Sequence, residues 1–369
     1  MTLRNALMVI SLALSIAIGW VIARGKPSAA AGAKGSAEAS ETRPLRIGLS
    51  LDTLKEARWV KDRDLFVEAA RKLGAEVLVQ SANSNDTKQM QDIQGLISRG
   101  VDVLVIVPHD GKAMGQAVDL ARRNGIPVLS YDRLITNTPS LDLYVTFDNE
   151  KVGELQARYL ADRLAEKPGS ARIVRIYGSP TDNNAKLFKA GQDRVIEPLV
   201  KTGRIQVVHQ DWAADWRPEN AKRITNAAIT RNGPKIDGIL ASNDGTAGGA
   251  VQALLEEGLA GAVVVTGQDA ELAALQRIVA GTQAMTVYKP VARLATKAAE
   301  LAVALARGDA IETNETLDNG RIEVPSIYAD VAVVDKSNIR ETVIKDGFHT
   351  YEDIYRSVPG SERPPRTGE

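Results

Sequence analysis

The stretch RGVDVLVIVP, residues Arg99–Pro108, decides the fold class of this chain of 369 residues. Its centre, Val103–Val107, is an unbroken run of apolar and mostly β-branched residues bounded by Gly100 and Pro108. A run of this kind is typical of a strand buried on both faces. Such strands occur in parallel sheets that helices cover from both sides, so the stretch predicts an α/β fold.

The same strand-and-helix alternation continues on both sides of this stretch. Before it, the predicted elements are the strand Leu45–Leu51, a helix over Leu65–Leu73, the strand Val77–Val79 and the helix Met90–Ile97. After it come the helix Ala113–Arg123 and the strand Ile126–Leu129. Glycines follow several helices, as expected where a helix stops.

The pattern then starts again in the second half of the chain. Predicted strands are Ile173–Ile176, Val207–Val208, Ile236–Leu240, Val263–Val265 and Met285–Val287, and predicted helices are Ala185–Val200, Glu219–Thr230, Gly245–Glu257, Leu272–Ala280 and Val291–Ala306. So many strands exceed what one sheet comfortably holds. We therefore predict the fold class as two doubly wound parallel-sheet lobes joined by a multi-strand hinge.

The lobes are expected to be discontinuous in sequence. We assign residues 44–147 and 290–325 to the N-terminal lobe, 148–289 and 326–350 to the C-terminal lobe, and 351–369 to a disordered tail. Hinges are expected near Phe147-Asp148, Tyr288–Pro290 and Pro325–Ile327.

Residues 1–43 read as an export segment followed by a low-complexity linker. Arg4 precedes an apolar run, Ala6–Ala23, and a stretch rich in Ala, Ser and Gly then extends to Ser40. This order is typical of a secretory signal, with candidate cleavage sites ending at Ala30 or Ala33. A retained membrane anchor stays open, because the apolar run is long for a signal. Either way we expect the body of the protein in the periplasm.

Composition excludes several classes of function. The net charge is zero, and the first thirty residues contain bases but no acids, so the remainder is mildly acidic and unsuited to nucleic acid. No cysteine is present, and the three histidines, His109, His209 and His349, lack metal-ligand spacing. We expect no catalytic residues, metal or cofactor, because no nucleophile-and-base set or phosphate-binding loop is recognisable.

Polar and aromatic side chains follow nearly every predicted strand. In open parallel sheets, ligands bind beyond the carboxyl ends of the strands, so these side chains are expected to meet in one cleft. They include Arg58, Trp59, Asp132, Arg133, Asp182, Asn183, Asn184, Trp212, Trp216, Asn243, Asp269 and Lys289. Carboxylates, carboxamides and guanidinium groups match sugar hydroxyls, and tryptophan matches the apolar face of a sugar ring.

Several of these residues have a purely structural alternative. Asp132 and Arg133 could be a local turn pair, and Asp244 and Thr246 are better explained as helix caps. The run Asp62-Arg63-Asp64 is expected to be a solvated helix face, and His109 a satisfied structural residue. Trp212 and Trp216 are four residues apart, so one of them can face the lobe while the other faces the cleft.

At these strand ends the chain resembles the periplasmic sugar-binding proteins of the ribose-binding type, and within them the branch that binds D-xylose for ABC importers. The resemblance spans residues 45–349 and rests on motifs including RWVKDRDLF (Arg58–Phe66), SYDR (Ser130–Arg133), FDNEKVGELQA (Phe147–Ala157), DNNAKLF (Asp182–Phe188), ASND (Ala241–Asp244), GQDAEL (Gly267–Leu272) and GTQAMTVYKP (Gly281–Pro290).

The resemblance implies a function and a role for each site residue. Trp59 and Trp216 would enclose the pyranose ring; Arg58, Asp132 and Arg133 would bind hydroxyls from one lobe, Asp182, Asn184, Asn243 and Asp269 from the other, and Lys289 would lie at a hinge. The implied partner is the membrane permease of an ABC importer, served by a monomer. A sensor that presents sugar to a membrane receptor, or a protein for another pentose or hexose, stays open. A repressor of related fold would begin with a helix-turn-helix rather than an apolar segment.

Overall fold

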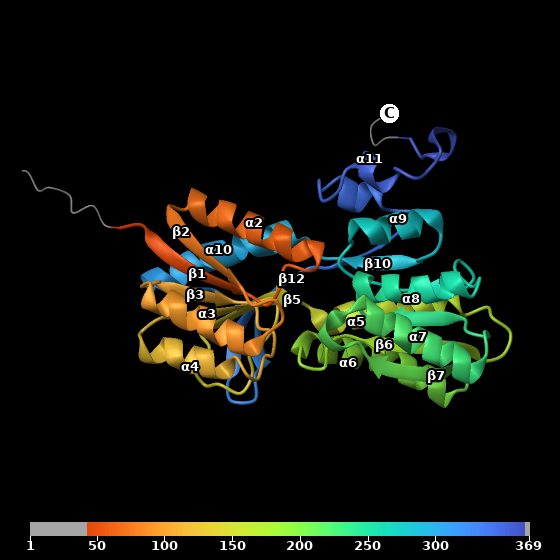
Figure 1. The fold of residues 1–369 in the computed structure, drawn as a ribbon, viewed down its shortest axis with the longest axis horizontal. Coiled ribbons are helices and arrows are strands. Elements are labelled where there is room, and N and C mark those ends of the chain that lie inside the picture. Colours follow the sequence, from red (N-terminus) through yellow and green to blue (C-terminus); the bar gives the residue numbers. More distant parts are fainter. Residues whose placement is uncertain (1–42, 366–369) are drawn as a thin grey trace, which may run out of the picture. The chain divides into compact units, whose positions relative to one another are not determined.

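The computed structural model describes residues 43–365, in which helices cover the β-sheets of two lobes (Figure 1). The predicted signal segment or anchor lies outside the described residues. No helix among the residues that the structure describes is long and apolar enough to cross a membrane.

The first lobe is built on a sheet of seven strands in the order β11-β12-β5-β4-β3-β1-β2. All neighbours pair in parallel except β11 and β12. Its elements in chain order are β1 (Leu45–Leu51), α2 (Ala57–Lys72), β2 (Ala75–Ser81), α3 (Asp86–Ser98), β3 (Val103–Ile106), α4 (Gly115–Arg123), β4 (Val128–Tyr131), β5 (Leu143–Phe147), and later α10 (Val291–Arg307), β11 (Glu315–Asp318) and β12 (Glu323–Ala329).

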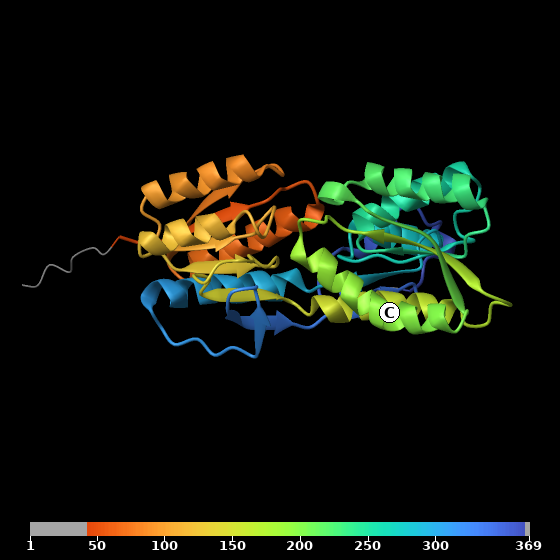
Figure 2. The same cartoon turned by 90° about the horizontal axis from the view of Figure 1, so that it is seen from below.

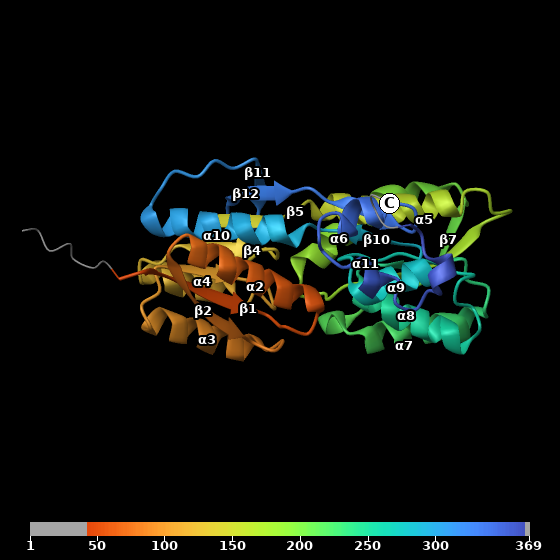
Figure 3. The same ribbon diagram turned by 90° about the horizontal axis from the view of Figure 1, so that it is seen from above.

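Strand β3 explains why Val103–Val107 is apolar without interruption. Val103 and Val105 belong to the core beneath α2 and α10, whereas Leu104 and Ile106 belong to the core beneath α3 and α4. Figure 3 shows α2 and α10 over one face of this lobe, with β11 and β12 along one side, and Figure 2 shows α3 and α4 from the opposite side. A strand covered on both faces needs apolar residues at every position.

The second lobe repeats this plan with a smaller sheet. Strands β7-β6-β8-β9 are parallel, β10 pairs antiparallel with β13, and a bridge between Gln268 and Val287 connects the two groups. The elements are α5 (Asn149–Arg163), β6 (Ala171–Tyr177), α6 (Asn183–Lys201), β7 (Ile205–Trp212), a 3-10 turn (Ala214–Trp216), α7 (Pro218–Asn232), β8 (Gly238–Ala241), α8 (Asp244–Glu256), β9 (Val264–Val265), α9 (Leu272–Ala280), β10 (Met285–Tyr288) and β13 (Ala332–Asp335). The predicted fold class is confirmed.

The chain passes between the two lobes at three places. Two of them, after β5 and after β10, lie at the expected hinges. The third expected hinge, Pro325–Ile327, is misplaced. Ser326–Ala329 pair in parallel with Tyr144–Phe147 of β5, so this segment is part of the first sheet and the crossing follows at Asp330 and Val331.

The prediction of a disordered tail from residue 351 is also wrong for its described part. After a π-helical turn (Arg340–Ile344), helix α11 (Tyr351–Ile354) lies against α9, and a further 3-10 turn spans Gly360–Glu362 (Figure 1). Ile354 and Tyr355 are buried in the same core as Leu275. Apolar side chains at positions 351, 354 and 355 give the helix a face to bury.

Candidate functional site

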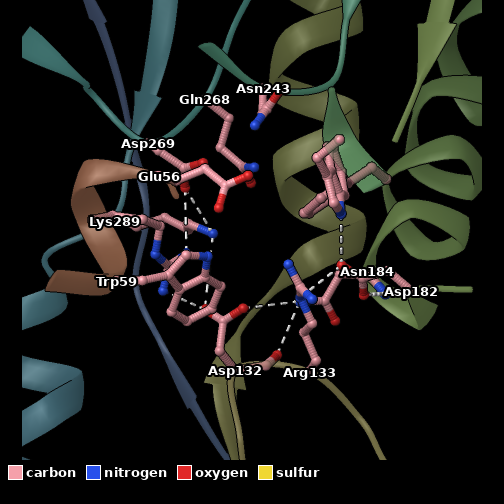
Figure 4. Close-up of a pocket in the computed structure, with 13 residues that line it drawn as sticks. Glu56, Trp59, Asp132, Arg133, Asp182, Asn184, Asn243, Gln268, Asp269 and Lys289 are labelled. Carbon is pink, nitrogen blue, oxygen red and sulfur yellow. Dashed lines mark hydrogen bonds and ion pairs between the residues drawn. The ribbon is translucent and has the colours of Figure 1, made fainter. Parts of the chain in front are cut away.

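A small cavity lies where the two lobes meet. The ten residues that the family resemblance assigned to the site all line it, whereas Asn183 and Trp212 do not (Figure 4). The complete lining is Glu56, Arg58, Trp59, Asp132, Arg133, Asp182, Asn184, Phe188, Trp216, Asn243, Gln268, Asp269 and Lys289. Because the strands are parallel within each lobe, their carboxyl ends bring these loops to one place.

Three of the lining residues hold a left-handed backbone without being glycine. The φ angles are 62° at Asp132, 56° at Trp216 and 97° at Asp269. Such conformations are unfavourable for residues with a Cβ, and they persist where the surrounding structure fixes them. All three lie in the segments that follow strands β4, β7 and β9, and all three line the cavity.

Arg58, on the first turn of α2, is the central cation of the site. Its Nη2 lies 2.7 Å from Asp132 Oδ2, and its Nη1 lies 3.3 Å from Asp269 Oδ1 in the other lobe. Burial alone would lower the pKa of Arg58, but the carboxylates of Asp132, Asp62 and Asp269 raise it well above its ordinary value. The guanidinium therefore stays charged inside the protein.

Arg133 is the second buried cation and also joins the lobes. Its Nη1 lies 2.7 Å from Asp52 Oδ2, and its Nε lies 2.9 Å from Asp182 Oδ2 in the second lobe. His109 Nδ1 lies 2.9 Å from the other oxygen of Asp52, as expected of a structural histidine. Burial raises the pKa of Asp52, but His109 and Arg133 outweigh it and hold that pKa below its ordinary value.

Lys289 completes the charge pattern from the segment between β10 and α10. Its Nζ lies 3.0 Å from Asp269 Oδ1 and 3.9 Å from Asp132 Oδ2. Burial raises the pKa of Asp132, yet Arg58 and Lys289 bring it below the ordinary value. The cavity therefore presents charged acceptors and charged donors side by side, four carboxylates against three cations.

The two predicted tryptophans lie in the cavity, and Trp212 does not line it. The Trp59 ring centroid is 4.2 Å from the Arg58 guanidinium carbon and 5.2 Å from that of Arg133. Trp216 donates from Nε1 to Asp182 Oδ2 at 3.1 Å, which fixes its ring. Trp212 instead packs on Tyr177, with 4.9 Å between ring centroids.

The two asparagines contribute through helix starts. Asn184 donates from Nδ2 to the Asp132 carbonyl across the lobes at 2.9 Å, and its backbone N–H donates to the α6 cap, Asp182. Asn243 is the N-cap of α8: its Oδ1 accepts from Thr246 N at 2.9 Å. The cap is therefore Asn243 and not Asp244, which was predicted as a cap. Thr246 has the structural role that was predicted for it, as the capping-box partner of Asn243.

The prediction for Asp62 is wrong. Asp62 is 1% exposed, and its carboxylate accepts from Arg58 and from the Tyr131 hydroxyl. Its spacing of four residues from Arg58 on one helix was the available signal. Glu56 and Phe188 were not predicted, although Phe188 lies within the motif DNNAKLF. Gln268 follows the predicted strand Val263–Val265 but was not assigned to the site.

Chemically, the cavity is suited to recognising a polar ring. Paired carboxylates, guanidinium groups and an ammonium offer hydrogen bonds to hydroxyls, and two indole rings offer apolar faces. Among the residues that the structure describes, no group of three or more metal-ligating side chains of the His, Cys, Asp or Glu type is present.

Residues 47–310 match the family described as "Periplasmic binding protein domain". The chain belongs to this periplasmic binding protein family. It is 52% identical over 316 residues to the D-xylose-binding periplasmic protein of Haemophilus influenzae, covering 86% of this chain and 94% of that protein. Identity to the D-xylose-binding periplasmic protein of Escherichia coli is 50% over the same shares of the two chains.

A solved structure of the family supports the assignment. The carbohydrate transporter solute binding protein of Chloroflexus aurantiacus, in complex with D-glucose, is 33% identical and has a TM-score of 0.79, covering 85% of this chain and 98% of its own. The resemblance noted from the sequence motifs is therefore confirmed, as is the type of fold it implied.

Proposed function

We propose that this chain is an exported binding protein that takes up D-xylose in the interlobe cavity and delivers it to an ABC importer, without chemical conversion. The site residues are those predicted, with Trp59 and Trp216 against the ring faces and Arg58, Asp132, Arg133, Asp182, Asn184, Asn243, Asp269 and Lys289 on the hydroxyls.

The observation that carries the proposal is the convergence of all these side chains on one cavity from both lobes. The chain is 52% and 50% identical to two proteins named for D-xylose binding, and this identity is the reason for proposing D-xylose as the sugar. The three cations of the lining face four carboxylates, so no positive charge is left over for an anion, and the set suits a neutral ligand with several hydroxyls.

Location and partners follow from the same relatives, which are named as periplasmic proteins. We infer a periplasmic monomer that delivers xylose to a membrane permease. Contacts such as Arg133–Asp182 and Arg58–Asp269 join the lobes beside the cavity, so a ligand bound there would favour the closed arrangement.

Calorimetric titration of the body from Thr42 against a panel of monosaccharides tests the proposal. We expect D-xylose to bind one to one and more tightly than the other sugars. Chromatography of xylose after incubation with excess protein should recover the sugar unchanged. A product peak would contradict a binding function, and no heat with any sugar would contradict the ligand class.

A second ligand is favoured by one observation. The solved relative from Chloroflexus aurantiacus holds D-glucose, so a hexose is the alternative to a pentose. The same titration decides between them, because a preference for D-glucose over D-xylose would replace the ligand while leaving the class of function intact.

A further inference from the structure

Glu56 carries an acceptor that no described residue satisfies. It lies in the segment between β1 and α2, and its side chain is 10% exposed. Its Oε1 lies 3.1 Å from Lys55 Nζ, whereas its Oε2 is fully buried and receives no hydrogen bond. A buried carboxylate oxygen without a donor is unfavourable and requires a reason.

Gln268 presents the same situation from the opposite lobe. It follows β9, is 3% exposed, and donates from Nε2 to the Ser242 carbonyl at 3.4 Å. Its backbone carbonyl accepts from Asp244 N at 2.9 Å, which fixes the segment. Its Oε1 is buried and, among the described residues, has no donor.

Both side chains extend into the interlobe cavity described above (Figure 4). Two unpaired acceptors on one cavity, one from each lobe, call for a donor that arrives with the ligand. A sugar hydroxyl supplies such a donor, since its proton is free to rotate toward either oxygen.

Lys55 holds the Glu56 carboxylate in this orientation. Its ammonium pairs with Oε1 and also donates to the Asp215 carbonyl of the second lobe at 2.6 Å. One oxygen is thereby held toward Lys55, and the other is left for the cavity. Asp215 is the residue before Trp216, so this contact lies beside one of the two indoles.

We propose that Glu56 and Gln268 are specificity-determining residues that together accept the proton of one hydroxyl of the bound monosaccharide. This inference rests on the proposed sugar-binding function and adds to it a contact that joins the lobes. Glu56 is the stronger acceptor of the two, because it is charged.

The experiment combines protein variants with sugars that lack single hydroxyls. Wild-type protein is first titrated with D-xylose, and then with its analogues deoxygenated at each position in turn. The variants are Glu56→Ala and Gln268→Leu. The matched control is Glu68→Gln, on α2, where Glu68 pairs with Lys72 and is 52% exposed.

We expect Glu56→Ala to weaken xylose binding about 10- to 100-fold, the range for losing a hydrogen bond to a charged group, and Gln268→Leu to weaken it about 3- to 10-fold. One analogue should bind wild type at least as weakly as xylose binds Glu56→Ala, because it loses the Gln268 contact as well. That analogue should lose nothing further on the variant, because the same interaction is already absent. Glu68→Gln should bind xylose as wild type does.

Thermal melting without sugar separates recognition from folding. Removing an unpaired buried acceptor should leave the melting temperature of the empty protein unchanged or higher, whereas loss of a structural residue would lower it. The inference would be overturned if Glu56→Ala bound xylose within about twofold of the wild-type affinity. It would also be overturned if Glu56→Ala bound every analogue more weakly than wild type does, by the same factor as for xylose. If wild type binds no sugar at all, the proposed function fails instead, and the two failures are therefore distinct.

Discussion

Asp62 holds Arg58 from one helical turn away, with Asp62 Oδ2 3.3 Å from Arg58 Nε and Asp62 Oδ1 3.3 Å from Arg58 Nη2. Both side chains are buried, and Asp62 does not line the cavity. Asp62 therefore acts on the site through Arg58, whose Nη2 also donates to Asp132 and whose Nη1 donates to Asp269.

We predict that Asp62→Asn weakens xylose binding by roughly 10-fold, as loss of one charge-assisted contact to Arg58 should. The amide keeps the shape of the carboxylate but places N–H groups against a guanidinium or the Tyr131 hydroxyl. Titration calorimetry measures the loss. Asp64→Asn makes the same charge change on a side chain that is 63% exposed and should have no effect. Equal affinity of Asp62→Asn and wild type would show that Arg58 needs no support from Asp62.

The tryptophans provide a second prediction. Trp59→Ala and Trp216→Ala should each cost at least ~2 kcal/mol of binding free energy, roughly 30-fold in Kd, because each removes a buried aromatic surface from the cavity. Trp212→Ala should leave affinity nearly unchanged and instead lower stability, since that ring packs on Tyr177. Titration together with urea unfolding distinguishes the two effects, and a dominant loss at Trp212 would exclude the proposed ring contacts.

Gly178 provides a steric prediction. A Cβ on Gly178 would lie 2.0 Å from Trp216 Cη2 and 2.3 Å from two further atoms of the same ring. Because the ring is also fixed by Asp182, Gly178→Ala must displace it from the cavity, and the loss of xylose affinity should approach that of Trp216→Ala.

Gly95→Ala is the matched control for this substitution. Gly95 lies within α3, and a Cβ there meets nothing within 4 Å. The alanine should leave affinity unchanged and stabilise the protein by about 1 kcal/mol through helix propensity. Wild-type affinity in Gly178→Ala would mean that the Trp216 ring can move without consequence for the sugar.

The sequence predicted the two sheets best where strands are buried on both faces. Leu45–Leu51 has the observed bounds of β1, and the predicted helices in the second half lie within a few residues of α6 to α10. Strand β5 and helix α5 were not predicted, although Leu143–Phe147 is fully buried. The edge strand β11 was not predicted either. It is largely exposed, so its sequence has little of the apolar pattern by which a strand is recognised.

The site was predictable to the extent that strand ends could be located. Asp132, Asp269 and Lys289 follow β4, β9 and β10, so topology alone brings them together. Glu56 and Asp62 were not predictable in this way. Glu56 lies several residues beyond β1, and the role of Asp62 depends on which side of α2 faces Tyr131 of the same lobe. Charged residues at these positions fit a solvated segment equally well.

The free energy of unfolding should depend on pH through the acidic side chains of Glu271 and Asp244. Burial, followed by the charges of Asp244, Asp269 and Glu56, raises the pKa of Glu271 to about 8. The unfolded chain releases this proton near pH 4.5, so between about pH 4.5 and 8 the folded state holds a proton that the unfolded state has lost. Stability contributed by this group therefore falls as the pH rises through that window.

Glu271→Gln stays neutral and removes this dependence. Urea unfolding of the empty protein should show a smaller loss between pH 5 and pH 8 in the variant than in wild type, by at least ~1 kcal/mol, given about 1.4 kcal/mol for each unit of pKa shift. Asp244, whose pKa burial raises to about 7, remains in both proteins and leaves a residual slope. Glu257→Gln, on an exposed residue, should follow wild type, and a variant with the wild-type slope would refute the assignment to Glu271.

The last prediction concerns closure of the lobes. Contacts across the cavity include Arg133–Asp182 at 2.9 Å and the hydrogen bond from Lys55 Nζ to the Asp215 carbonyl at 2.6 Å. Arg133 and Asp182 line the cavity, so bound xylose would lie beside their contact. Lys55 is not among the lining residues. Because ligand contacts come from both lobes, sugar should bind the closed arrangement better and shift the population toward it. Small-angle scattering should therefore give a smaller radius of gyration at saturating xylose.

Lys55→Ala removes a closing contact without removing a lining residue. The empty variant should therefore have a larger radius of gyration than empty wild type, and xylose should bring both proteins to the same closed value. An unchanged radius at confirmed saturation would mean that the site is already closed when empty.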